Sequence, residues 1–289
     1  MTAASTVAQP VTSHVLRRLP SLLDAIWWEV RKLRAQARAR YTLLVVALAP
    51  ILIVVIVHGQ QRPPKDTLFG RYAHDSGFSV ALLVLGFASQ WVLPLLTTIV
   101  AGDIFASEDQ LGTWKTVLTR SVSRRQLFWA KTLTATGFTV LLLLILSTVT
   151  IVSSALVVGR QPLLGLSGQT IPAGTAVWLT TASWASALAP MLAITSLAIL
   201  LSVRSRNPAV GIAAPVVLVM IMQLVGALGG LEGLRPLLIT TPFEAWHGLL
   251  VQHRFTRPLV EGIAVSAGWC AVCLGSAYTS LRRRDITGG

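Results

Sequence analysis

Charged residues are scarce in this sequence. They make up 12% of its 289 residues, about half the share that a soluble domain carries. Hydrophobic residues account for 53%, and the formal net charge of +13 comes from basic residues that are spread between long apolar segments. This spread argues against a nucleic-acid-binding protein, which would gather its basic residues on a polar domain. It is typical of a membrane protein whose basic residues meet anionic lipid headgroups.

The sequence also lacks the patterns that carry catalysis or hold a metal. Its two cysteines, Cys270 and Cys273, lie three positions apart in an apolar segment, so they form neither a disulfide framework nor a zinc site. Free cysteines of this kind usually pack as small core residues. No P-loop, nucleophile elbow or H-E-x-x-H motif occurs. We therefore expect that the chain is not an enzyme and holds no ATP, cofactor or metal of its own.

Six stretches without a charged residue reach or approach the length that crosses a bilayer, about 20 residues. Because one charge at mid-membrane costs about 2.5 to 3.5 kcal/mol, such stretches indicate membrane spans. They predict an all-α membrane protein with spans at about 41–57, 78–101, 132–159, 173–203, 208–231 and 262–281. Residues 1–20 are expected to be a disordered cytoplasmic tail, and 21–289 to form a single domain. Three prolines fall inside spans: Pro94, Pro190 and Pro215.

The positions of arginine and lysine predict the orientation. With the N-terminus inside, 17 of the 24 fall on the inner side, and inner loops are enriched in these residues. We therefore expect both termini in the cytoplasm. The six stretches contain no Asp, Glu or His, one of which a proton-coupled carrier would usually place there. The driving force is therefore expected to come from a separate protein.

Residues 21–40 predict an amphipathic helix in front of the first span. Ser21 and Asp24 form a capping box, which marks a helix start. Apolar residues then recur at helical spacing and include Trp27. The charged residues take other faces, among them Glu29, Lys32 and Arg34. Such a helix lies in the plane of the membrane. The alternative is a basic anchor that only sets the topology.

Residues 102–131 form the long inner loop between the second and third spans. Ser107 with Gln110 is a second possible capping box, and Gly112 can end that turn. An apolar stripe follows and must be buried against the membrane surface or another protein; it consists of Leu111, Trp114, Val117 and Leu118. Ser123 could cap the helix that leads into the third span.

The outer loop after the fifth span also carries a helix signal. Thr241 as N-cap, Pro242 at the first position and Glu244 at the third predict a helix that starts at Pro242. Its apolar face would consist of Phe243, Trp246, Leu249 and Leu250. By its pattern alone this helix is a connector that lies on the surface.

The order of these segments resembles the ABC-2 type permeases. An E-x-x-K-L run begins at Glu29, and Ser-Glu-Asp-x-x-Gly-Thr begins at Ser107. Leu-Thr-Arg-x-Val-Ser-Arg-Arg follows at Leu118, and Arg-Arg-Arg-Asp begins at Arg282. The resemblance covers nearly the whole chain in its six-span layout. This chain departs from the family at Ser121, where proline is common, and in the Glu-Asp pair of the loop, where the family has two glutamates.

The resemblance implies that the loop 102–131 is a coupling helix that docks into a groove of a cytoplasmic ATPase subunit. It places seven residues at that contact: Glu108, Asp109, Gly112, Thr113, Trp114, Leu118 and Arg120. The N-terminal helix, with Trp27, Glu29, Lys32 and Arg34, would flank the same interface. The resemblance also implies a re-entrant helix pair at the outer end between the fifth and sixth spans.

We therefore expect the permease subunit of an ABC exporter in the bacterial cell membrane. Two ATPase subunits would hold ATP and magnesium, and a second permease copy or a paralogue would complete the pathway. The cargo would be amphipathic or lipophilic, such as a drug, antibiotic, peptide or lipid, and would meet apolar, Ser and Thr side chains on the second and fifth spans. The alternatives are a non-transporting immunity or assembly protein and, less favoured, a secondary carrier.

Overall fold

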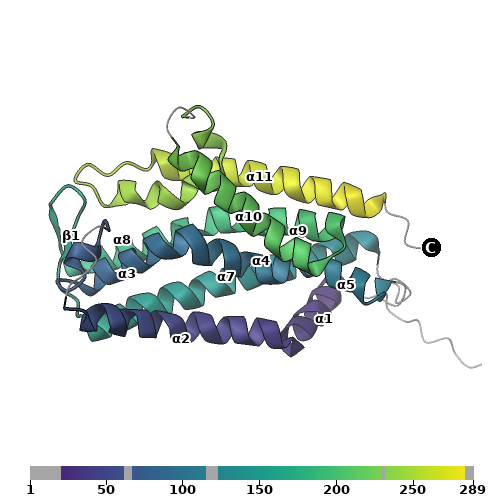
Figure 1. Ribbon diagram of the computed structural model, residues 1–289, viewed down its shortest axis with the longest axis horizontal. Helices are drawn as coiled ribbons and strands as arrows, with labels where there is room; N and C mark the ends of the chain where they lie inside the picture. Colours follow the sequence, from purple (N-terminus) through teal and green to yellow (C-terminus); the bar gives the residue numbers. More distant parts are fainter. Residues whose placement is uncertain (1–20, 62–66, 115–122, 229–231, 284–289) are drawn as a thin grey trace, which may run out of the picture.

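The computed structural model describes residues 21–61, 67–114, 123–228 and 232–283. Within these residues, six helical segments are long and apolar enough to cross a membrane (Figure 1). They are Ala37–Gly59, Gly77–Ala101, Arg124–Val157, Ala173–Ser205, Pro208–Ala227 and Arg257–Arg282. The predicted all-helical membrane fold with six spans is confirmed, and most span ends lie within a few residues of the charge-free windows.

Four of the spans are single helices, and two are interrupted. The single helices are α2 (Ala37–Gly59), α7 (Arg124–Val157), α10 (Pro208–Ala227) and α11 (Arg257–Arg282). The second span consists of α3 (Gly77–Phe87), the π-helical turn η2 (Ala88–Val92) and α4 (Leu93–Ala101). The fourth consists of α8 (Ala173–Ser186) and α9 (Leu188–Ser205), which meet at Ala187.

Proline accounts for the positions of these interruptions. Pro94 is the second residue of α4, just after the η2 turn, and Pro190 lies in the first turn of α9. Proline has no N–H to donate to the carbonyl four residues earlier, so the helix ladder opens in front of it. Pro215 lies inside α10, which continues through it. Neighbouring helices can satisfy the carbonyls that the prolines leave free, and two of these carbonyls recur below.

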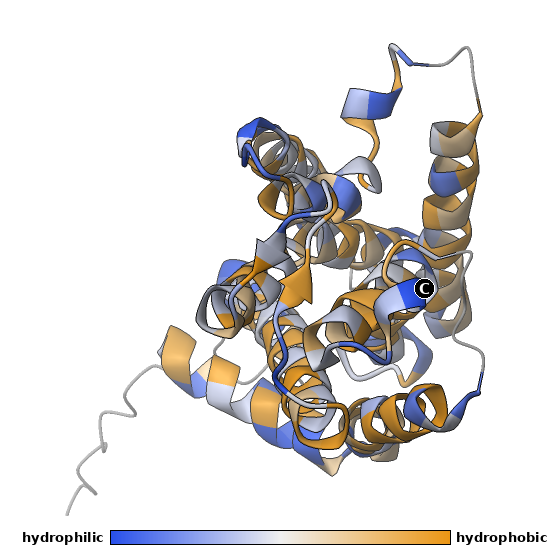
Figure 2. Cartoon of the chain, turned by 90° about the vertical axis from the view of Figure 1, so that its left-hand side faces the viewer, coloured by the Kyte–Doolittle hydropathy of each residue, from blue (hydrophilic) through white to orange (hydrophobic). Residues whose placement is uncertain are grey.

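The second and fourth spans form the centre of the bundle. In the apolar window of each, 67% of the residues are buried, compared with 17% for the fifth and sixth spans. Figure 2 shows hydrophobic residues on the outward faces of the long helices as well as between them. A helix of this kind, hydrophobic all round, belongs in lipid or in a larger assembly. The fifth and sixth spans therefore offer their outward faces to lipid or to a further chain.

The two ends of the bundle differ in structure (Figure 1). One end, called the α5 end, carries α1 (Leu22–Ala35), α5 (Ala106–Gln110) and the last turn of α11. The opposite end, called the hairpin end, carries the antiparallel strands β1 (Leu163–Leu164) and β2 (Thr170–Ile171). It also carries the short helix η1 (Gly70–Tyr72) and the last residues of η4 (Thr241–Leu249), whereas η3 (Arg235–Leu237) lies beside the middle of α11, where the Leu237 carbonyl accepts from Trp269.

The first helix has the predicted cap but not the predicted length. The hydroxyl of Ser21 accepts from the Asp24 amide, and the carboxylate of Asp24 accepts from the Ser21 amide, so the capping box is present. Gln36 has extended backbone and separates α1 from α2. The expected helix over 21–40 is therefore divided, and its last residues begin the first span. The predicted disordered tail, 1–20, lies outside the described residues.

Candidate functional site

The loop after the second span carries α5, which ends in a tight glycine turn. The Thr113 amide donates to the Glu108 carbonyl, and the Gly112 amide donates to the Asp109 carbonyl. This pair of bonds is the Schellman motif, which needs a left-handed residue. Gly112 supplies it, with φ of +64°. The predicted role of Gly112 in ending the turn is confirmed.

The predicted capping box in this loop is wrong. Ser107 lies inside α5, whose N-cap is Phe105, and no side chain of that residue caps the helix. The free amides at the start of α5 are satisfied from another span, because Ser202 Oγ of α9 accepts from the Phe105 amide at 3.2 Å and the Ala106 amide at 3.0 Å. The start of the loop helix is therefore fixed to the fourth span. Ser123 does cap α7, in a capping box with Gln126, as expected.

A charge cluster of four residues lies beneath α5: Glu29, Lys32, Glu108 and Lys131. The Lys131 side chain is 0% exposed, and its Nζ lies 2.9 Å from Glu108 Oε1 and 3.1 Å from Glu29 Oε2. The ammonium group of Lys32 pairs with the same Glu108 oxygen, and the Thr113 hydroxyl donates to the other. Two carboxylates and two ammonium groups make the cluster neutral, as burial requires.

The ionisation of Glu108 reflects this setting. Burial would raise the pKa of the carboxyl, but the charge of Lys131 and the hydrogen bonds from Lys32, Thr113 and Lys131 outweigh burial and lower the pKa to about 2. Glu108 is therefore a carboxylate at any physiological pH. A second ion pair, between Arg38 at the start of α2 and Asp103, lies nearby.

The structure separates the predicted docking residues into an inner and an outer group. Glu108 is buried, and Trp114 is 7% exposed, with its indole N–H donating to Asp109 Oδ1 at 2.9 Å. The outward tip consists of Gln110, Leu111 and Gly112. Leu118 and Arg120 lie outside the described residues. The docking role of the whole set stays a prediction, and among the described residues of the loop its exposed surface is the tip.

The N-terminal helix divides in the same way. Trp27 is 52% exposed and Arg34 is exposed, whereas Glu29 is 4% exposed and Lys32 is partly buried. Arg31 lies over the Trp27 ring, 5.4 Å from its centroid. Sequence reasoning placed Glu29 on a polar face but missed that it faces Lys131, which is 102 positions away. The spacing of Glu29 and Lys32, i and i+3, was the only signal that both side chains could face the same cluster.

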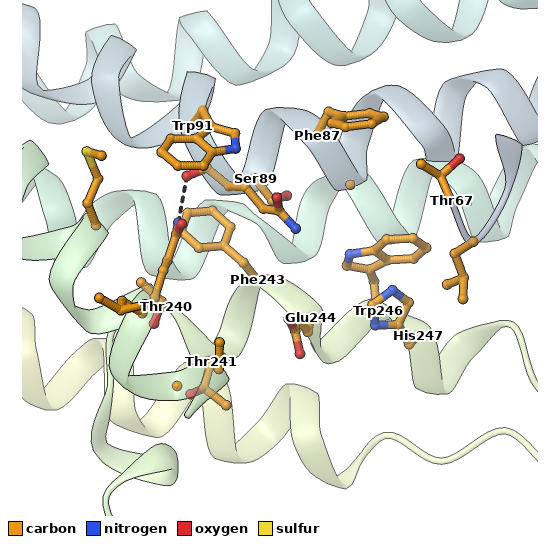
Figure 3. A pocket seen from close by; sticks show the side chains of 18 of the residues that line it. Thr67, Phe87, Ser89, Trp91, Thr240, Thr241, Phe243, Glu244, Trp246 and His247 are labelled. Atoms are coloured by element: carbon orange, nitrogen blue, oxygen red, sulfur yellow. Dashed lines mark hydrogen bonds between the residues drawn. The ribbon is translucent and has the colours of Figure 1, made fainter. Parts of the chain in front are cut away.

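A pocket of about 1010 Å³ lies between the second span, the fifth span and η4. Figure 3 shows Phe87, Ser89 and Trp91 of the second span on one side and Phe243 and Trp246 of η4 on the other. From the fifth span, apolar lining residues include Val217, Met220, Ile221 and Leu224. A large, mostly apolar and aromatic cavity with a few polar groups is the usual form of a ligand site.

The polar groups of the pocket lie in two places. Ser89, Gln90 and Gln223 belong to the second and fifth spans, and Arg235, Glu244 and His247 belong to η3 and η4. Burial lowers the pKa of His247, although Glu244 acts in the opposite direction, so the imidazole is neutral at pH 7. The pocket thus has mostly apolar walls, with polar groups on the spans and along η3 and η4.

The fifth span is joined to the second at the two carbonyls that proline affects. Pro94 cannot donate to the Gln90 carbonyl, and this carbonyl accepts instead from Gln223 Nε2 of α10 at 2.6 Å (dashed in Figure 3). Pro215 cannot donate to the carbonyl of Gly211, and this carbonyl lies against Gly102, where an added Cβ would be 2.2 Å from the oxygen. The sequence shows that the two prolines fall inside spans, but it predicted neither the Gln223–Gln90 hydrogen bond nor the contact of Gly102 with Gly211.

The outer helix differs from its prediction at its start. The segment η4 is a 3₁₀ helix that begins at Thr241, its N-cap is Thr240, and no side chain caps it. The predicted cap fails because the Thr241 hydroxyl donates to the Arg235 carbonyl instead. The predicted apolar face is present and buried, with Phe243 at 4% and Trp246 at 2% exposure, and Trp246 stacks on Phe69. The segment packs into the bundle, so it is no surface connector.

Comparison with known proteins gives one family. The family described as "ABC-2 family transporter protein" matches residues 25–229, from the first helix through the fifth span. No curated protein matches the chain. The matched range includes α1, the loop with α5, the charge cluster and both membrane-spanning walls of the pocket.

Proposed function

The chain belongs to the ABC-2 family of transporter proteins, and from this premise we propose that it is the permease subunit of an exporter driven by a separate ATPase. Permeases of this family in general associate with an ABC ATPase. The observation that carries the proposal is the loop tip at the α5 end. The tip is exposed, whereas the start of α5 is bonded to Ser202 and Glu108 is held in the charge cluster. A partner that pushes on such a tip moves the helices to which it is attached.

The docking surface that we propose is the tip Gln110, Leu111 and Gly112. Leu111 is 68% exposed at the end of a rigid turn. An exposed leucine on a short, well-held turn is suited to a groove on a partner, where its burial would contribute free energy of association. Glu108, Thr113 and Trp114 would act from behind, by holding the shape of the tip.

The cargo pathway that we propose is the pocket between the second and fifth spans. Its aromatic walls suit a lipophilic or amphipathic cargo. The charged groups of η3 and η4 in its lining, Arg235 and Glu244, favour a molecule with a polar head. The proposal includes a second permease copy or paralogue against the outward faces of the fifth and sixth spans, and two ATPases on the cytoplasmic side of the bacterial cell membrane.

The first experiment tests docking. The full chain is co-expressed with the ABC ATPase encoded beside its gene, and co-purification from membranes is measured for the wild type, Leu111→Asp and Leu237→Asp. Both leucines are more than 60% exposed, but Leu237 belongs to η3, which packs against α11 and η4 and lies away from the loop tip. Loss of an interface anchor worth about 2 kcal/mol would weaken binding roughly thirtyfold. We expect this weakening for Leu111→Asp and not for Leu237→Asp.

A second pair of variants tests the turn itself. The position of Gly112 is sterically open, with nothing within 4 Å of an added Cβ, so only its backbone conformation constrains the choice of residue. Gly112→Ala costs about 1–2 kcal/mol in the left-handed region, whereas Gly112→Asn tolerates it. ATPase binding should fall with alanine and persist with asparagine. Absence of any ATPase association with the intact wild-type loop would contradict the proposal and favour a non-transporting immunity or assembly protein.

A further inference from the structure

A buried lysine at the base of α7 is shared by two helices that come from different parts of the chain. Lys131 donates to Glu29 of α1, to Glu108 of α5 and to the Ile104 carbonyl, at 3.1, 2.9 and 3.1 Å. An ammonium group has three protons to donate, so all of them are used.

We propose that Lys131 is a positioning residue that fastens α1 to α5, so that a displacement of the loop is carried into α1 and then into the first span. The source of the displacement, an ATPase at the loop, rests on the function proposed above. The fastening itself rests on the geometry of the charge cluster alone.

The physical basis is the cost of separating the charges. Glu29 and Glu108 are 4% and 1% exposed, so neither carboxylate can turn to water. The cavity beside the cluster is about 10 Å³, close to the least volume that holds one water molecule. If α1 or α5 moved alone, it would leave a buried charge without its partner, which is strongly unfavourable. The two helices must therefore move as one body.

The first span has its own link to the same segment. Arg38, in the first turn of α2, pairs with Asp103, whose side chain is 4% exposed. In the sequence, Gln36 separates α1, which carries Glu29 and Lys32, from α2, which carries Arg38. Both helices are thus tied to residues 103–108, on either side of the break. A movement of the loop would be passed to both.

The test is whether loosening one helix also loosens the other, which we call reciprocity. It is measured by amide hydrogen exchange on the full chain in lipid nanodiscs. Glu29→Gln removes the pair between α1 and Lys131 and keeps the direct pair between Lys32 and Glu108. Glu108→Gln removes both of the pairs that Glu108 makes, so Lys32→Gln, which removes the direct α1–α5 pair alone, is measured beside it. If Lys131 fastens the helices, each variant raises amide exchange in the other helix as well as in its own, by at least about tenfold. Lys131→Arg, which keeps the charge, should restore most of the protection that Lys131→Met loses.

The matched control is Asp24→Asn, which weakens the exposed capping box of α1. It should raise exchange in the first turn of α1 and leave α5 unchanged. Variants that loosen only the helix in which they lie would overturn the inference, and would reduce Lys131 to a local structural residue. This comparison does not depend on Lys131→Met, which removes the shared cation and is the variant most at risk of misfolding.

A further arm separates this inference from the proposed function. With the neighbouring ATPase, ATP and magnesium added, exchange in α1 should change in the wild type and remain at its resting value in Glu29→Gln. ATPase binding without reciprocity would overturn the fastening and leave the permease proposal intact. Reciprocity without ATPase binding would overturn the permease proposal and leave the fastening intact.

Discussion

The α5 end and the pocket near the hairpin end differ in how their charges are held. At the α5 end, both carboxylates of the charge cluster and the Lys131 ammonium are buried and paired. At the pocket, Arg235 and Glu244 are 3.9 Å apart, and both are more than half exposed. Exposed pairs contribute little, about 0–1 kcal/mol, whereas loss of one partner from a buried pair is costly. The first arrangement holds one geometry, and the second can adapt to different occupants.

The sharpest way to break this contrast is to remove the centre of the charge cluster. Lys131→Met should lower the free energy of unfolding by about 3–5 kcal/mol, because two buried carboxylates lose their common cation. Glu108→Gln should cost less, and the double variant should cost less than the sum of the two. Thermal unfolding in detergent, followed by size-exclusion chromatography, measures all three. Additive effects would show that the two residues act independently.

A change of pH should reveal how much stability the charge of Glu108 contributes at the α5 end. The pKa of Glu108 in the folded protein is about 2, below its ordinary value of 4.5. The stability that its charge contributes is therefore complete above pH 4.5 and is lost as the pH falls toward 2. The neighbouring charges are Lys32, Lys131 and Glu29. We expect the difference in unfolding free energy between wild type and Glu108→Gln to be constant above pH 4.5 and to shrink below it. A difference that changes between pH 5 and 8 would contradict this assignment.

The next largest effect on stability is expected at the backbone contact between Gly102, after the second span, and Gly211 of the fifth span. In Gly102→Ala the new Cβ would meet the Gly211 backbone at 2.2 Å, which no side-chain rotation can relieve, so the cost should be about 1–3 kcal/mol. Gly137→Ala in α7 is the matched control, because nothing lies within 4 Å of its Cβ, and it should be neutral or stabilising by up to about 1 kcal/mol. Equal stability of the two variants would mean that α4 and α10 are not in close backbone contact.

The smallest effect is expected at the Gln223 hydrogen bond. Gln223→Leu removes one hydrogen bond in the membrane, worth about 0.6 kcal/mol on average, which corresponds to roughly threefold in an opening equilibrium. The readout is the rate of thiol labelling at Gly86→Cys, a pocket position, after Cys270 and Cys273 are replaced by serine. A reporter at Gly268→Cys on α11 should keep its rate. An unchanged rate at position 86 would show that this bond does not hold the pocket closed.

The spans and helix caps were predictable because their signals are local. Absence of charge over about 20 residues located six helices, and the Ser21 and Ser123 capping boxes marked two helix starts correctly. The chain around Lys131 shows the limit of this reasoning. A hydropathy window ends at the first charge, so Lys131 was assigned to the loop, although α7 begins at Arg124 and includes it.

The pairings were not predictable because their partners are far apart in the chain. Glu29 lies 102 positions from Lys131, and Gln223 lies 133 positions from Gln90. Two predicted capping motifs also failed. The helix α5 begins at Ala106, before Ser107, and Ser202 of α9 accepts from the Phe105 and Ala106 amides at its start. At η4 the Thr241 hydroxyl bonds to the Arg235 carbonyl, six positions earlier, instead of capping the helix.

The π-helical turn at Ala88–Val92 sets the phase of the second span. Such a turn amounts to one residue added to an α-helix, and one residue corresponds to about 100° of rotation. Deleting a single residue there would leave both halves of the span helical but would turn one against the other. If Phe87 kept facing the pocket, Gly102 would rotate away from Gly211. This one wide turn therefore decides whether the pocket wall and the loop attachment can face their partners at the same time.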